Sequence, residues 1–275
     1  MKPMTIIATV AMAVVYLAIR TTSASDATVF FIFASVIVVL PYVAGPILIR
    51  FKQRHSVHPQ LEPKAPQDLP GEVSEFFQRA TQDLTGEGFT VWPAFTHRAQ
   101  NATAHLKLFL NREVGDSIIA TAIYSNAKGV ERLRTKNLII TTKLDDGQRY
   151  VTSNTQVRGI FRNPQGQHGL FLPQIRDNSQ LYKIHRAWLA KAAPAGQRIL
   201  PAKGREVDAI AEEMTGNLDR QVELGFFYID RVSDSYRPTW KGAVLMTWKV
   251  CWPVKQIRKV YRARKDKEIV HSLGF

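Results

Sequence analysis

The sequence is poor in cysteine, with Cys251 as the single example among 275 residues. An intramolecular disulfide is therefore excluded, and an apolar core has to hold the fold together. Acidic residues are also scarce beside basic ones, with 23 aspartates and glutamates against 37 lysines and arginines. The resulting net charge of +14 favours an anionic partner, which means lipid headgroups, nucleic acid or an acidic protein.

The sequence also lacks the motifs of common enzymes. No Gly-rich phosphate loop ends in Lys-Ser or Lys-Thr, no Gly-x-Gly-x-x-Gly follows an expected strand, and no Gly-x-Ser-x-Gly elbow occurs. His55 and His58 are three residues apart, but no cysteine or acidic helix completes a metal site around them. The sequence therefore predicts no catalytic residue, no metal site and no cofactor, although an acid–base pair assembled only by folding leaves no such trace.

Two polar features have structural interpretations. His185 is next to the apolar face that Leu181, Ile184 and Trp188 form at helical spacing, which favours a hydrogen-bonded histidine at the edge of the core over a catalytic base. The adjacent carboxylates in the Asp-Asp-Gly sequence at 145–147 lie between two alternating runs, which is typical of a hairpin turn. Neither feature predicts an active site.

Two runs near the N-terminus carry no charge, residues 4–19 and residues 28–49. As a helix the second run is about 33 Å long, which matches the thickness of about 30 Å of a bilayer hydrocarbon core. The runs predict a transmembrane hairpin over residues 1–51, with helices at about 4–19 and 28–49. The first run also resembles a secretory signal peptide, so its cleavage is an open alternative.

Basic residues predict the orientation of this hairpin. Arg50, Lys52 and Arg54 follow the second run, whereas Asp26 is the one charged residue of the loop at 21–27. Because lysine and arginine accumulate on the cytoplasmic side of membrane spans, the sequence predicts that both termini and the rest of the chain are cytoplasmic.

A Pro-rich linker is expected at residues 52–70, followed by an α+β domain at 71–240. Helical spacing begins at Glu72, and helical patterns return after a candidate N-cap at Asp177 or Asn178 and over residues 205–224. Between these helices an antiparallel β-meander is predicted, and a further strand at residues 226–232 follows the last helix. The strands of the meander are expected at residues 89–97, 104–110, 117–125, 133–144 and 148–153.

The C-terminal segment, residues 241–275, holds nine lysines and arginines against two acidic residues. After Pro253 the spacing predicts an amphipathic helix with an apolar side and a basic side. Val254, Ile257, Val260 and Tyr261 form the apolar side, and the candidate residues for contact with a membrane surface are Trp248, Trp252, Lys255, Arg258, Lys259 and Arg262.

Three interpretations of this helix remain open: a core helix with a solvated basic face, a helix lying on an anionic leaflet, and a site for nucleic acid or an acidic protein. No nucleic-acid reader motif occurs, which makes nucleic acid the least favoured partner. We therefore expect a membrane-anchored cytoplasmic interaction or scaffold module that docks on the anionic inner leaflet. The alternative is a membrane-bound enzyme whose active site is not contiguous in sequence; the oligomeric state is left open.

Overall fold

The computed structural model describes residues 26–127, 130–156, 165–193, 196–251 and 253–275, and for residues 26–38 and 127 it describes the backbone alone. The chain forms two compact units, each built from two segments. The first unit combines residues up to His55 with Leu218–Arg258, and the second combines Ser56–Asn217 with Lys259–Phe275.

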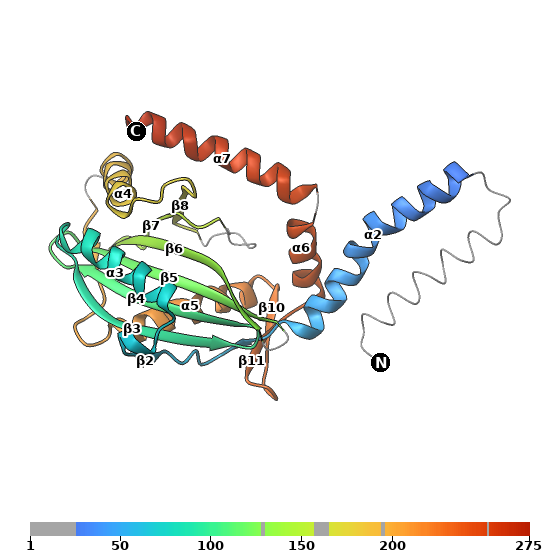
Figure 1. Cartoon of the computed structure of the whole chain (residues 1–275), viewed down its shortest axis with the longest axis horizontal. Coiled ribbons are helices and arrows are strands. Elements are labelled where there is room, and N and C mark those ends of the chain that lie inside the picture. The colour runs from blue at the N-terminus through green and yellow to red at the C-terminus, as the bar shows by residue number, and fades with distance from the viewer. Residues whose placement is uncertain (1–25, 128–129, 157–164, 194–195, 252) are drawn as a thin grey trace. The chain divides into compact units, whose positions relative to one another are not determined.

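A large sheet with the strand order β2-β3-β4-β5-β6-β7-β8 forms the centre of the second unit (Figure 1). Neighbouring strands from β2 to β7 are antiparallel, which confirms the predicted meander, whereas β7 and β8 are parallel. The short strand β9 (Arg198–Ile199) pairs with the end of β6. The strands are β2 (Glu62–Lys64), β3 (Thr90–Ala99), β4 (Ala102–Asn111), β5 (Asp116–Ala127), β6 (Val130–Leu144), β7 (Arg149–Ser153) and β8 (Gln167–Phe171).

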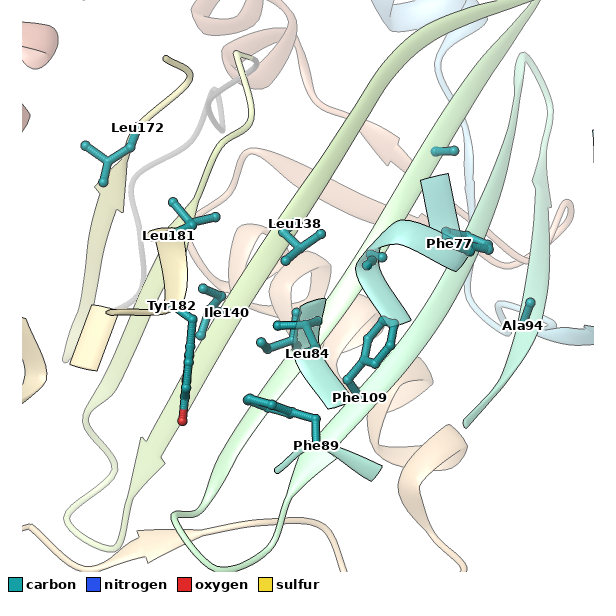
Figure 2. Packing of buried hydrophobic residues seen from close by; sticks show 14 of the residues in the cluster. Phe77, Leu84, Phe89, Ala94, Phe109, Leu138, Ile140, Leu172, Leu181 and Tyr182 are labelled. Carbon is teal, nitrogen blue, oxygen red and sulfur yellow. The ribbon is translucent and has the colours of Figure 1, made fainter. Parts of the chain in front are cut away.

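Two helices cover one face of this sheet, α3 (Gly71–Thr85) and α4 (Asn178–Ala192), as Figure 2 shows. Because residues opposite each other in a ladder share a face, the pairs Ile118↔Ile140 and Ala120↔Leu138 point toward these helices together. All four side chains are fully buried in the main apolar core. The sheet with its helices confirms the α+β class.

The opposite face of the sheet is covered by the first half of α5 (Glu206–Glu223). Leu108 and Leu110 of β4 are buried there with Ile210, and Trp92 and Met214 pack against them. Phe109, which lies between Leu108 and Leu110 in β4, is buried in the main core on the other face. Successive residues of β4 therefore belong to two separate cores, as a side-chain period of two produces in a strand covered on both faces.

Local sequence signals explain several element boundaries. The Asp177 carboxylate accepts a hydrogen bond from the Gln180 backbone amide at 2.7 Å, so Asp177 is the one of the two candidate residues that caps α4. The turn at 145–147 is also confirmed, because Gly147 has a φ of +83° and Asp146 accepts from the Gln148 backbone amide at 2.8 Å. The expected linker at 52–70 contains β1 (His55–Ser56), β2 and the short helix η1 (Pro66–Asp68).

The first unit pairs two helices, α2 (Asp26–Lys52) and α6 (Trp240–Val250), beside a small sheet of order β1-β11-β10. The hairpin strands β10 (Phe227–Asp230) and β11 (Ser235–Pro238) are antiparallel. Two edge-to-face aromatic contacts connect the helices, with ring centroids 5.6 Å apart for Tyr42 and Trp248 and 6.4 Å apart for Phe51 and Trp240. Contacts at both ends of α6 indicate that the two helices run antiparallel.

The predicted transmembrane hairpin is wrong: in the part of the chain that the structure describes, no helix has both the length and the apolar character needed to cross a membrane. The first predicted span, residues 4–19, lies outside the described residues. Residues 28–49 belong to α2, whose second half packs on α6. The prediction of two spans, and of cytoplasmic termini with it, is therefore not supported. An uncharged run can also pack on another helix of the same chain, as the second half of α2 packs on α6, while Val39 and Val43 stay more than half exposed.

Candidate functional site

A group of buried polar side chains lies where α4 meets the large sheet. Asp116 of β5, Thr142 of β6, Thr152 of β7 and His185 of α4 each have no exposed surface. Buried polar groups without partners are costly, so the hydrogen bonds among these side chains decide whether the arrangement is stable.

Thr142 connects the carboxylate to the imidazole. Its Oγ1 donates to Asp116 Oδ1 at 2.5 Å, so the same oxygen accepts from His185 Nε2 at 2.9 Å. His185 Nε2 must then carry the ring proton, and Nδ1 accepts from Thr152 Oγ1 at 2.8 Å. The chain of hydrogen bonds fixes one neutral tautomer of the histidine.

The second carboxylate oxygen of Asp116 also has partners from α4. Tyr182 donates its hydroxyl to Asp116 Oδ2 at 3.1 Å, and Arg186 forms an ion pair with the same oxygen at 3.2 Å. The buried charge is therefore compensated by a guanidinium and two hydroxyl donors, which is the condition under which a buried carboxylate is tolerated.

Burial keeps the other two titratable groups of this network neutral. It lowers the pKa of His185 to about 4, against the opposing effect of Asp116, and it raises the pKa of Tyr182 together with the same carboxylate. At neutral pH the imidazole and the phenol are therefore uncharged hydrogen-bonding groups. The expectation of a hydrogen-bonded core histidine at position 185 is confirmed.

This network resembles a catalytic relay in composition but not in accessibility. His185 and Thr142 are wholly enclosed, and both imidazole nitrogens already have partners, so a substrate has no atom to approach. Across the described residues, no three His, Cys, Asp or Glu side chains gather as a metal site. The network instead joins β5, β6 and β7 to α4.

The C-terminal helix α7 (Val254–Ser272) has its apolar side toward solvent. Ile257 is 64% exposed, Val260 54% and Tyr261 71%. Of the predicted basic face, Lys255 and Lys259 are exposed, whereas Arg258 and Arg262 are partly covered. The observed orientation therefore differs from a core helix with its basic side in water.

Helix geometry identifies which cations flank the exposed apolar residues. Positions i, i+3, i+4 and i+7 share a face, which places Arg264 in line with Ile257, Val260 and Tyr261. Lys265 and Lys267, also exposed, lie on either side of this line at about 100° per residue. We call Ile257, Val260, Tyr261, Arg264, Lys265 and Lys267 the α7 stripe.

The three cations of the α7 stripe were not among the residues singled out from the sequence. The expected face ran through Lys255, Arg258, Lys259 and Arg262 because those residues lie opposite the apolar ones at helical spacing. The spacing of Arg264 from Ile257 was a visible signal. What the sequence did not contain is which side of the helix is covered.

The end of α7 is held by the main core. Ile269, Val270 and Leu273 pack against the buried cluster of the second unit. Lys191 of α4 also donates to the Ser272 carbonyl at 3.3 Å. These contacts fix the last turns of the helix and leave the apolar residues of the stripe in solvent.

Trp248 belongs to a second exposed row, on α6 in the first unit. Trp240, Val244 and Trp248 follow each other at i, i+4 and i+8 and are 53%, 53% and 55% exposed. The other tryptophan expected at a surface, Trp252, lies outside the described residues.

The fold is thus an α+β arrangement with a helix-covered sheet and a solvent-exposed amphipathic C-terminal helix. Comparison of the chain with protein families, curated proteins and solved structures finds no match. Its function therefore has to be argued from its own residues.

Proposed function

We propose that the protein is an interaction module that binds an anionic lipid surface through the α7 stripe. The observation that carries this proposal is the exposure of Ile257, Val260 and Tyr261 on one face of a helix, followed on that side by the exposed cations Arg264, Lys265 and Lys267. An apolar row with flanking lysine and arginine is the composition of helices that lie in the plane of a lipid interface.

The charge of the protein and its exposed aromatic residues also suit a lipid surface. Each lysine or arginine near an anionic lipid surface contributes about 1 kcal/mol, and the net charge of +14 adds long-range attraction. Tyr261 combines an apolar ring with a polar hydroxyl, which suits the boundary between acyl chains and headgroups. The exposed Trp240 and Trp248 of α6 have the same amphipathic character.

The enzyme alternative has less support from the geometry. It requires acid–base groups within reach of a substrate, and the most connected set of such groups, around Asp116 and His185, is closed to solvent. The binding proposal needs no such opening, because its residues are already exposed.

Vesicle flotation of the whole protein tests the proposal. Vesicles of phosphatidylserine and phosphatidylcholine should carry the protein at low salt, whereas pure phosphatidylcholine should not. Binding should weaken as salt rises toward physiological strength, where exposed charges are screened within about 8 Å. Equal binding to both vesicle types, or no binding to either at low salt, contradicts an anionic lipid surface as the partner.

A further inference from the structure

The face of the sheet beneath α3 and α4 becomes polar at the end away from Asp116. His105 and Thr103 of β4, Thr96 of β3 and Tyr124 of β5 are all at least nine-tenths buried there, with His105 8% and Tyr124 9% exposed. Thr96↔His105 and Thr103↔Tyr124 are opposite pairs in the ladders, so these side chains share one face.

His105 is fixed by two neighbours. Its Nδ1 lies 2.9 Å from Thr96 Oγ1, and its ring meets the Tyr124 ring edge-on at a centroid distance of 5.7 Å. Burial lowers the pKa of His105, as do Arg98 and Lys64, while Glu131 opposes the shift. The imidazole is therefore neutral at neutral pH and does not repel a cation.

A hydrogen-bond relay crosses the same face. Asn126 Nδ2 donates to Thr103 Oγ1 at 3.3 Å, and Thr103 Oγ1 donates to Glu131 Oε1 at 3.2 Å. Asn126 and Glu131 are opposite each other in the ladder between β5 and β6. The relay therefore orients an amide and a carboxylate side by side on neighbouring strands, with the Asn126 side chain partly covered and the Glu131 side chain exposed.

This relay leaves acceptors in excess of donors. Asn126 Oδ1 is buried and, within the described part of the chain, has no hydrogen-bond partner. Burial raises the pKa of Tyr124, and so do the carboxylates of Glu72 and Glu131. A buried acceptor without a donor costs about 1–3 kcal/mol, so a donor-bearing guest is favoured at this place.

We propose that Asn126, Glu131 and Tyr124 bind a primary ammonium group of a small molecule. Its three N–H groups match an amide oxygen, a carboxylate and a phenol oxygen, and the Tyr124 ring supplies an aromatic surface for the attached carbon chain. The site is independent of the α7 stripe, because it lies on the sheet and selects the opposite charge.

Titration of the whole protein with butylammonium tests the site, with butanol as the neutral control of the same length and butyrate as the anionic one. Butylammonium should saturate, with a dissociation constant of about 1 mM as expected for so small a ligand, and should lower the pKa of His105 further in an NMR pH titration. The His105 resonance is identified by its loss in His105→Gln. Butanol and butyrate should leave that resonance unchanged.

Paired variants decide whether the proposed groups are responsible. Glu131→Gln, which keeps the size of the side chain, should weaken butylammonium binding by about threefold, as expected for an exposed carboxylate, whereas Glu113→Gln, at an exposed carboxylate in the β4–β5 turn, should not change it. If butylammonium fails to saturate, or if Glu131→Gln binds it as the unchanged protein does, the site is not an ammonium site.

Discussion

Gly45 of α2 lies so close to Thr247 of α6 that a Cβ atom on the glycine would meet the threonine Cγ2 at 2.6 Å and Oγ1 at 2.9 Å. Thr247 is itself 2% exposed and donates its hydroxyl to the Ala243 carbonyl within α6. The absence of a side chain at position 45 therefore sets how closely the two helices approach. An apolar helix in this unit is thus packed on a specific protein surface.

The first prediction follows from this contact. Gly45→Val places branched carbons where Thr247 already is, and overpacking of this kind costs about 1–3 kcal/mol. Urea denaturation should show the loss. Gly216→Ala in α5 is the control, because nothing lies within 4 Å of its added methyl and a helical alanine should stabilise by about 0.5–1 kcal/mol. Equal stability of the two variants would show that α2 and α6 are not in close contact.

The second prediction concerns the pH dependence of stability. His185 titrates near 6.5 in an unfolded chain and near 4 in the fold, so between these values the unfolded state binds the extra proton. The contribution of neutral His185 is complete above about pH 6.5 and decreases as the pH falls toward 4, by at most about 3 kcal/mol. Urea denaturation at several pH values measures this decrease.

His185→Gln is the matched control for that pH dependence, because its amide forms hydrogen bonds but does not titrate. The variant should be less stable than the unchanged protein at pH 7, and its stability should decrease less between pH 6.5 and 4. A pH profile parallel to that of the unchanged protein would assign the acid sensitivity to other groups.

The third prediction compares the ion pair of Asp116 and Arg186 with the hydrogen bond that Tyr182 donates to Asp116. Asp116→Asn removes the ion pair with Arg186, and we expect a loss of about 3 kcal/mol, near the lower limit for a broken buried pair because the arginine side chain keeps 33% of its surface exposed. Tyr182→Phe removes one neutral donor and should cost about 1 kcal/mol. Thermal and urea unfolding measure both values. A larger loss for Tyr182→Phe than for Asp116→Asn would contradict the assigned roles.

Local periodicity predicted much of the second unit correctly. Alternation between residues 89 and 153 gave the antiparallel strands, and the helix beginning near Glu72 and the cap at Asp177 were read from residue type and spacing. These signals succeed because hairpin strands pair with their sequence neighbours and helix ends need a local acceptor. Strand β11 was missed, since Ser235–Pro238 is too short for a period to be visible.

The other misses have a common physical cause, which is contact between remote segments. Strand β8 is parallel to β7, and this pairing depends on the course of the whole chain. Asp116 directly follows a glycine at the start of β5 and gives no sign of a buried ion pair with Arg186. What the apolar residues of α2 contact, and which side of α7 is exposed, depend likewise on where the rest of the chain lies.

The fourth prediction tests the α7 stripe against the face expected from the sequence. The triple variant Ile257→Gln, Val260→Gln and Tyr261→Gln should remain as stable as the unchanged protein, because these side chains are more than half exposed. It should also lose affinity for acidic vesicles by more than about tenfold, since the apolar area that enters the interface is gone. The matched variant is Arg258→Gln with Arg262→Gln, whose side chains are partly covered.

The most direct measurement of the central claim is flotation of the whole protein and these two variants on phosphatidylserine vesicles at low salt. The account predicts that the unchanged protein and the Arg258/Arg262 variant float with the vesicles, whereas the Ile257/Val260/Tyr261 variant stays in the soluble fraction. If the stripe variant floats as the unchanged protein does, the exposed face of α7 is not a lipid-binding surface and the proposed function is contradicted.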